Sequence, residues 1–175
     1  MKLSLVVLLG LLVPHATAQS LRTQSIYTSL NARDCITLEQ HTGPGEFIRQ
    51  RCPGVGKYRL EVSEGDLRSN VQVQYPDGHL STLDLISRVS SGFSSLGPKA
   101  EWRVQKNLPV ALILRYNASE NPEDGSLITS YLVVSKITSK SACVVGIIKP
   151  QANQNVLARK LADQALQKPC LEPEF

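Results

Sequence analysis

Two carboxylates on either side of a glycine, Glu64 and Asp66, come nearest in this chain to a catalytic pair. Two carboxyl groups in different environments can act as general acid and general base in a hydrolysis. Residues of this kind also shape tight turns, and Glu64-Gly65-Asp66 predicts such a turn. The pair therefore supports only an alternative function, that of a small carboxylate-dependent hydrolase.

Other catalytic and metal-binding arrangements are disfavoured by residue type. A hydrolase triad needs a serine or cysteine, a histidine and a carboxylate. Outside the predicted signal peptide, residues 1–18, the histidines are His41 and His79, and no G-x-S-x-G motif is present. Neither histidine has a second metal ligand at helical or strand spacing. Residues 117–125 are rich in oxygen ligands but lack the spacing of a calcium loop, so they predict a solvated turn. The sequence names no catalytic residue, metal ligand or cofactor.

Basic side chains in the first half of the chain form the candidate binding surface. Its members are Arg49, Arg51, Lys57, Arg59 and Arg68, to which Tyr58 and Trp102 add aromatic contact if they share the same face. Guanidinium and ammonium groups bind phosphate and carboxylate groups, such as those of an envelope polymer. A merely solvated face is the competing interpretation. The overall balance is mildly basic, about +3 once Lys2 is subtracted from the chain's +4, and it does not indicate a nucleic acid partner.

The N-terminus has the three parts of a secretory signal peptide. Lys2 gives the positive start, Leu3 to Val13 is an apolar run, and Ala16-Thr17-Ala18 is a small-residue cleavage site. We expect residues 1–18 to be the signal peptide and residues 19–175 to form a single domain. The apolar run is shorter than the roughly 20 residues of a membrane-spanning helix, and no later segment is long enough, so no membrane span is predicted. Asn117-Ala118-Ser119 is a glycosylation acceptor, which matters only in a eukaryotic host.

Four cysteines follow the leader, namely Cys35, Cys52, Cys143 and Cys170. An even number of cysteines in an exported chain predicts disulfides. Of the three connectivities that four cysteines allow, we favour Cys35–Cys52 and Cys143–Cys170, which join the cysteines nearest in sequence. On the loop-entropy model each bond stabilises the fold by roughly 3 to 3.5 kcal/mol.

Residues 126–170 predict two strands and a helix, around which the rest of the chain is organised. Residues 127–137 and 143–148 are rich in β-branched side chains and flank a short polar break, as in an antiparallel hairpin. Apolar residues then recur at helical spacing, and Pro169 marks the end of the helix. The predicted buried stripe consists of Val156, Leu157, Ala158, Leu161, Ala162, Ala165 and Leu166.

Earlier segments predict further strands. Residues 57–75 alternate between polar and apolar side chains on either side of a turn, which indicates a second hairpin. Short strands are expected near residues 35–38, 101–104 and 108–116, whereas residues 90–97 have the composition of a loop. The expected fold is therefore α+β, with an antiparallel sheet of five to seven strands packed by a C-terminal helix and linked by two disulfides.

Two stretches resemble small exported proteins of Gram-negative bacteria to which no function is assigned. One is Cys52-Pro53-Gly54-Val55-Gly56 with Val62 and Asp66-Leu67-Arg68, and the other is Cys143-Val144-Val145-Gly146 with the alanine-rich helix and Cys170. The resemblance covers about a third of the chain. It implies a periplasmic location and carries no catalytic residue across.

The sequence as a whole favours a non-enzymatic binding or interaction module of the cell envelope. Its partner would be an envelope polymer or another exported protein, and the alternative is a hydrolase of envelope material acting through Glu64 and Asp66. We expect the protein in the periplasm or outside the cell. The sequence predicts no oligomeric state.

Overall fold

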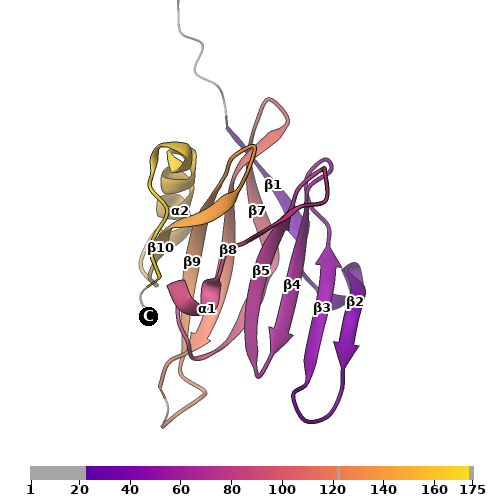
Figure 1. Cartoon of the computed structure of the whole chain (residues 1–175). Helices are drawn as coiled ribbons and strands as arrows, with labels where there is room; N and C mark the ends of the chain where they lie inside the picture. Colours follow the sequence, from indigo (N-terminus) through magenta and orange to yellow (C-terminus); the bar gives the residue numbers. More distant parts are fainter. Residues whose placement is uncertain (1–22, 122, 174–175) are drawn as a thin grey trace, which may run out of the picture.

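The strands form two antiparallel sheets in the part of the chain that the structure describes, residues 23–121 and 123–173 (Figure 1). In this computed structural model the first sheet has the order β1, β7, β8, β9, β10, with bounds Gln24–Ser29, Phe93–Gln105, Leu108–Ser119, Ile128–Ile137 and Ala142–Ile148. The second sheet runs in order from β2 to β6, with bounds Ile36–His41, Phe47–Cys52, Arg59–Gly65, Arg68–Gln74 and Leu80–Thr82. The described helices are α1 (Leu85–Arg88) and α2 (Gln154–Asp163), with short 3-10 turns at Ala32–Asp34 and Ala165–Gln167.

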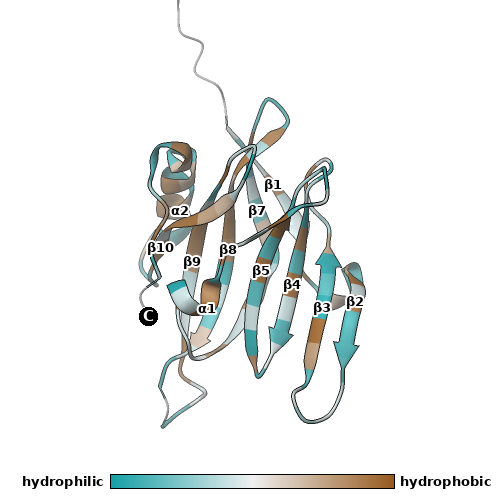
Figure 2. Cartoon of the chain, in the orientation of Figure 1, coloured by the Kyte–Doolittle hydropathy of each residue, from teal (hydrophilic) through white to brown (hydrophobic). Residues whose placement is uncertain are grey.

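The two sheets pack face to face around a shared apolar core. Its fully buried side chains include Leu60, Val71 and Val73 from the second sheet and Trp102, Leu112 and Tyr116 from the first. Figure 2 shows the hydrophobic bands that these strands carry along their length. Successive side chains of a strand point to opposite faces, so each strand contributes every second residue to this core.

Trp102 is a core residue and offers no aromatic contact at the surface. It is fully buried, and its indole nitrogen donates a hydrogen bond to the hydroxyl of Thr28 on β1 at 2.9 Å. The sequence placed Trp102 on the candidate binding surface, which this burial corrects. Strand alternation gives two faces but does not say which face is covered, and β7 is covered on both faces.

Helix α2 packs on the outer face of the first sheet and forms a third layer. Ala158, Ala162 and Ala165 are buried against this face, in a second cluster that includes Ile113 and Leu132. The buried stripe is narrower than the sequence predicts, because Val156, Leu157 and Leu166 remain exposed. Small alanine side chains allow the close approach, and so does Gly146 on β10, where an added Cβ would lie 2.4 Å from Cδ2 of Leu161.

Both predicted disulfides are confirmed. Cys35–Cys52 links the start of β2 to the end of β3, and Cys143–Cys170 ties the segment after α2 to β10. The same segment also pairs with β10 through a backbone hydrogen bond from Leu171 to Val144 at 2.8 Å. Two disulfides fit a protein that folds outside the cytoplasm, in an oxidising compartment. None of the helices among residues 23–121 and 123–173 is long and apolar enough to cross a membrane.

The predicted α+β class, the antiparallel pairing and the C-terminal helix are confirmed. The predicted single sheet of five to seven strands is wrong: the described strands form two sheets of five, because the N-terminal hairpins pair with one another and not with the C-terminal strands. One segment also differs in kind. Residues 93–97, which read as loop, are the first part of β7. Their serine and glycine content hid a strand that is held by long-range partners. Ser94 donates its backbone N–H to Leu67, and its hydroxyl accepts a hydrogen bond from Tyr116 at 2.7 Å. The predicted signal peptide lies outside the described residues.

Candidate functional site

The structure does not gather the predicted basic residues into one surface. Arg49 and Arg51 on β3 both donate to the carboxylate of Glu61 on β4, at 3.0 and 2.9 Å. Glu61 is only 2% exposed beneath them, and Glu39 gives Arg49 a second carboxylate partner. The hydrogen bonds to Glu61 and Glu39 raise the pKa of Arg49 above its ordinary value. Two of the predicted cations are therefore largely neutralised within the second sheet.

The remaining members of that group lie apart. Arg59 donates to the backbone carbonyls of Gly56 and Tyr58. Tyr58 packs its ring edge-on against Tyr75, with ring centroids 5.3 Å apart, and Lys57 is exposed in the turn before β4. Arg68 lies at the other end of the second sheet, because β4 and β5 run antiparallel and pair Arg59 with Gln74 and Gly65 with Arg68.

The carboxylate pair of the alternative function has structural partners. Glu64 accepts a hydrogen bond from the hydroxyl of Ser69 at 3.2 Å, and Asp66 forms an ion pair with Arg68. The side chain of Asp66 is 85% exposed. The two histidines of the described residues have other carboxylate partners, since His41 pairs with Glu39 and His79 with Asp77. Across residues 23–121 and 123–173, no three histidine, cysteine or acidic side chains gather in a way that could hold a metal ion.

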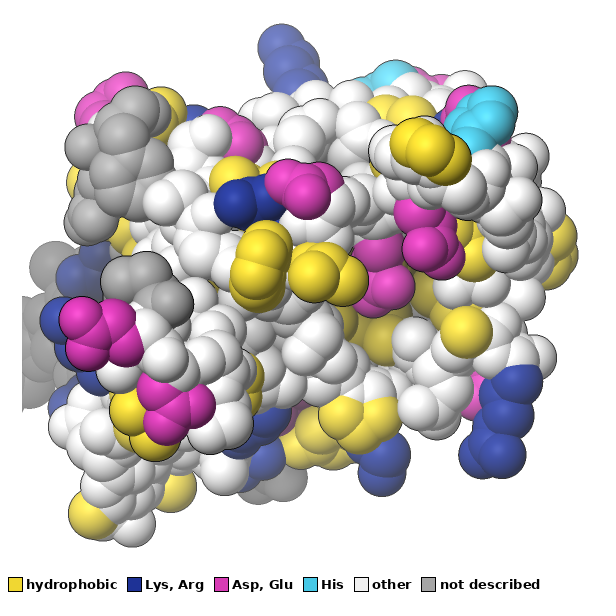
Figure 3. All heavy atoms as spheres, turned by 90° about the horizontal axis from the view of Figure 1, so that it is seen from below, with side chains coloured by type: hydrophobic (Ala, Val, Ile, Leu, Met, Phe, Trp, Pro, Cys, Tyr) yellow, Lys and Arg dark blue, Asp and Glu magenta, His cyan; other side chains and the backbone are white. Residues whose placement is uncertain are grey.

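Several turns meet at one end of the sandwich, which we call the lower end. It comprises residues 41–48, 64–68, 89–93, 119–121 and 123–129, and Figure 3 views the molecule from this side. A cavity of about 700 Å³ lies between Arg68, residues 89–93 and the start of the β8–β9 loop. A second cavity, of about 400 Å³, lies between the β2–β3 and β4–β5 turns. Clefts between loops at the end of a rigid sandwich are a common place for binding.

A two-residue turn with unfavourable backbone angles lines the second cavity, and Arg68, which follows the turn, lines the first. Asp66 and Leu67, which join β4 to β5, both have positive φ, at 49° and 57°. Turns of this type favour Asn-Gly because left-handed angles crowd the Cβ of other residues. Leu67 is nevertheless present and is 71% exposed. Residues held in sparsely populated backbone angles are more frequent at functional sites, which makes this exposed leucine a candidate residue of the site.

Arg68 and Phe93 support this turn from beside the larger cavity. Arg68 donates to the backbone carbonyl of Ser91 at 2.8 Å, and its guanidinium carbon lies 5.3 Å from the centre of the Phe93 ring. Phe93 is itself 49% exposed. Leu127 and Ile128, in the neighbouring loop, are also exposed. The lower end thus presents apolar side chains on a framework that is fixed by polar contacts.

The lower end is acidic although the whole chain is basic. Its segments contain six carboxylates, namely Glu46, Glu64, Asp66, Glu120, Glu123 and Asp124. Arg68 is the single lysine or arginine of these segments, and Arg88, the last residue of α1, comes directly before the segment 89–93. Figure 3 shows hydrophobic side chains near the middle of this face and acidic side chains around them. The chain's net charge is +4, so the excess of positive charge lies elsewhere on the molecule.

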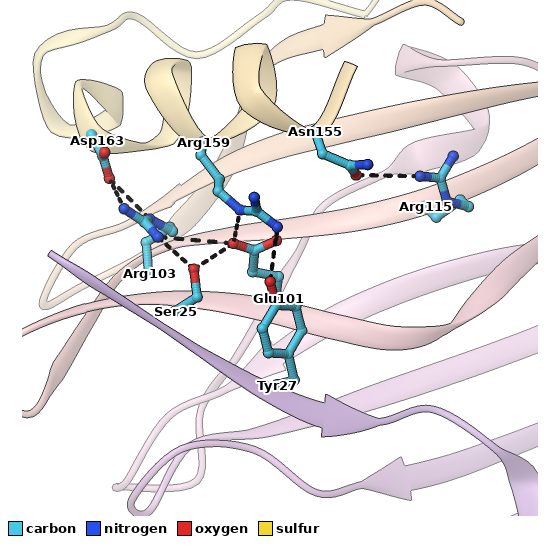
Figure 4. Close-up of polar contacts among 8 residues, drawn as sticks. All are labelled: Ser25, Tyr27, Glu101, Arg103, Arg115, Asn155, Arg159 and Asp163. Carbon is cyan, nitrogen blue, oxygen red and sulfur yellow. Dashed lines mark hydrogen bonds and ion pairs between the residues drawn. The ribbon is translucent and has the colours of Figure 1, made fainter. Parts of the chain in front are cut away.

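A buried polar network lies on the opposite face of the first sheet from the core, beneath α2 (Figure 4). Glu101 on β7 is at its centre and is 8% exposed. Arg159 of α2 donates to Glu101 with Nε at 2.7 Å and with a terminal nitrogen at 3.2 Å, and Ser25 of β1 donates its hydroxyl. Arg103, equally buried, donates to Ser25 and to Asp163 of α2. The network ties α2 to β1 and β7.

The charged form of Glu101 is favoured in this setting. Burial works to raise the pKa of Glu101, but the hydrogen bonds from Arg159 and Ser25 outweigh it and hold the pKa below its ordinary value. The hydrogen bonds with Glu101 raise the pKa of Arg159 in turn. Glu101 is therefore a carboxylate at neutral pH, and it has a structural role in holding α2.

Sequence reasoning missed this network and the lower end for different reasons. The members of the network come from residues 25 to 163, and only the folded sheet brings them together. A local signal was present in β7, where Glu101 and Arg103 alternate with buried Ala100, Trp102 and Val104. The lower end depends on four turns that no periodicity connects, although Asp66-Leu67 without a glycine in a two-residue turn was visible.

No protein-family model, no curated protein and no solved structure matches this chain. The resemblance to small exported proteins of Gram-negative bacteria therefore stays a prediction, and the function is argued from the described geometry.

Proposed function

We propose that this protein is a non-enzymatic interaction module that uses its lower end to bind a basic, partly apolar segment of another exported protein. The observation that carries the proposal is Leu67. Its side chain is 71% exposed, and it stands in a left-handed turn where glycine would be more favourable. A residue that is locally unfavourable and contributes little to the core is understandable if its side chain contacts a partner.

The negative charge of the lower end supports a basic partner. Six carboxylates around Leu67 and Phe93 attract cations and repel phosphate-rich or carboxylate-rich polymers. An envelope polyanion is thus the less favourable partner at this surface. A lysine- or arginine-rich segment with apolar side chains would place its charges on the carboxylates and its apolar groups in the cavities of about 700 and 400 Å³.

The two disulfides and the predicted signal peptide support a location outside the cytoplasm, and the resemblance favours the periplasm. The alternative of a carboxylate-dependent hydrolase rests on Glu64 and Asp66. It gains less support, because Asp66 is exposed and paired with Arg68. Equal hydrolysis by wild type and Asp66→Asn across envelope substrates would remove that alternative.

Peptides of matched length test the proposal directly. One carries several lysines and phenylalanines, a second replaces the lysines by glutamates, and a third replaces them by glutamines. Fluorescence anisotropy should show that the basic peptide binds most tightly and that the acidic peptide does not bind. Binding of the basic peptide should weaken as added salt shortens the Debye length, which is about 10 Å at 0.1 M. Glu120→Gln combined with Glu123→Gln should weaken binding, whereas Glu172→Gln, outside the lower end, should not. Equal affinity for the basic and acidic peptides would refute the proposal.

A further inference from the structure

A small pocket lies between α2 and the outer face of the first sheet, beside the polar network. Its volume is about 110 Å³. The apolar part of its wall is formed by Ile113, Leu132 and Ala158, and the polar part by Tyr27, Lys99, Glu101, Arg115 and Asn155. That volume corresponds to roughly four molecules of liquid water, since each occupies about 30 Å³. The pocket can therefore hold one small ionic group with a short stem.

The cations of this pocket have no charged partner. Arg115 donates to neutral oxygens, those of Ser130 at 2.9 Å, Gln154 at 3.3 Å and Asn155 at 3.4 Å. The ion pairs of residues 23–121 and 123–173 include neither Arg115 nor Lys99. Figure 4 shows Arg115 reaching toward Asn155 of α2. The guanidinium group is thus held in place by neutral contacts while its charge remains unneutralised.

The carboxylate of Glu101 does not cancel this positive charge. Both of its oxygens accept hydrogen bonds from Arg159, and Arg103 lies 3.8 Å from one of them. Around the pocket four cations, Lys99, Arg103, Arg115 and Arg159, face two carboxylates, Glu101 and Asp163. Two positive charges are in excess, and the two cations without an ionic partner among the described residues, Lys99 and Arg115, both line the pocket.

We propose that this pocket binds the carboxylate group of a small organic acid. The carboxylate would accept hydrogen bonds from Arg115 and Lys99, and the carbon stem would contact Ile113 and Leu132. A planar guanidinium group matches a carboxylate well, and its existing hydrogen bonds reduce the entropy lost on binding. The apolar wall favours an acid with a short carbon chain over an inorganic anion, which would leave that wall without contact.

NMR titration of the isotope-labelled, disulfide-intact protein tests the proposal, with butyrate, butyramide and inorganic phosphate as probes. Butyrate should shift the backbone amide signals of Ile113, Leu132 and Asn155 in a saturable way. Butyramide has the same shape without the charge, and phosphate has charge without a carbon stem. The affinity of each should be at least about tenfold lower than that of butyrate. Tighter binding of phosphate than butyrate would overturn the assignment to carboxylates, and equal binding of butyramide would overturn the role of charge.

Two variants locate the site. Lys99→Gln removes an exposed charge that has no ionic partner, so the fold should be unaffected while butyrate binds about tenfold more weakly. Arg115→Gln should weaken binding further, although it also removes contacts to β9 and α2. Lys140→Gln, on an exposed turn away from the pocket, is the matched control and should leave butyrate binding unchanged. Unaltered butyrate affinity in Lys99→Gln, or loss of affinity in Lys140→Gln, would refute the site.

Discussion

Replacing Leu67 by glycine is expected to stabilise the protein and to weaken binding at its lower end. The left-handed angles of Leu67, with φ of 57°, cost roughly 1 to 2 kcal/mol for a residue with a Cβ. Glycine removes this cost but loses about 0.5 to 1 kcal/mol through the greater freedom of the unfolded chain. The leucine side chain is 71% exposed, so little buried area is lost. The net expectation is a gain of about 0.5 to 1 kcal/mol.

Urea denaturation of the disulfide-intact protein measures this gain, as a higher midpoint at an unchanged slope. For a domain of this size the melting temperature should rise by about 2 to 4 °C per kcal/mol. Asn107→Gly is the matched control, because Lys106 and Asn107 form the corresponding left-handed turn between β7 and β8, with φ of 48° and 65°. Asparagine tolerates these angles better than leucine, so the control should gain less stability.

Binding of the basic peptide separates function from stability in the same two variants. Leu67→Gly should lower the peptide affinity about tenfold or more, as the loss of one well-packed apolar contact does at interfaces. Asn107→Gly should leave it unchanged. A clear loss of stability in Leu67→Gly would mean that the leucine packs in the fold and is not presented to a partner. A stabilised variant that binds the peptide as wild type does would refute the functional interpretation of this turn.

Three further predictions concern the packing of α2. Glu101→Gln should cost about 2 kcal/mol, because it removes the charged acceptor of the hydrogen bonds from Arg159, whose side chain is 40% exposed, while Arg103 keeps Asp163 as its partner. The pKa of Glu101 lies below its ordinary value of 4.5. The stability that its carboxylate contributes is therefore present at neutral pH and is lost as the pH falls below 4.5 and through the lowered pKa. Acid unfolding monitored by circular dichroism should show this pH dependence in wild type and less of it in the variant. Leu161→Ala should lower the stability by about 2 kcal/mol, the lower bound for a buried leucine, because Leu161 is partly exposed. Gly146→Ala should also lower the stability, because it brings a methyl group against Leu161. Combined with Leu161→Ala, it should no longer do so, because the contact is then absent. A double-mutant cycle by urea denaturation that finds no coupling between these two changes would contradict the close contact. Cys143→Ser should cost about 3.5 kcal/mol and leave Cys170 reactive toward a thiol reagent in the unfolded state.

Elements that depend on neighbouring residues could be predicted from the sequence. The hairpin over residues 57–75 is present as β4 and β5, because its alternation and its turn are both local. The hairpin before α2 is present for the same reason, and each disulfide joins the two cysteines nearest in sequence, 17 and 27 residues apart. The alanine-rich stripe correctly placed α2 against a sheet, although the helix ends at Asp163, before the end predicted from Pro169, and only part of the predicted stripe is buried.

Elements that depend on distant residues could not be predicted. Residues 93–97 form a strand only because β8 and the β4–β5 turn supply hydrogen-bond partners. The alternation of β7 does not tell whether Trp102 lies on a covered or an exposed face, because this depends on where the second sheet packs. The predicted basic surface failed as a patch because Glu61, which lies opposite Arg51 in the register of β3 and β4, neutralises its neighbours. The same pairing that builds the sheet thus removed charge that the linear sequence displays.

The uneven distribution of charge also identifies the strongest competitor for the proposed partner, a second copy of the chain. The carboxylates of the lower end and the unpaired cations Lys99 and Arg115 can attract each other between molecules as well as attract separate ligands. Sedimentation at low and high salt distinguishes these cases, because a contact between copies through the lower end would weaken with salt and with Leu67→Gly in the absence of peptide. A chain that is monomeric at both salt concentrations leaves the lower end free. In that case the salt dependence of peptide binding reports only the attraction between the carboxylates and the basic segment.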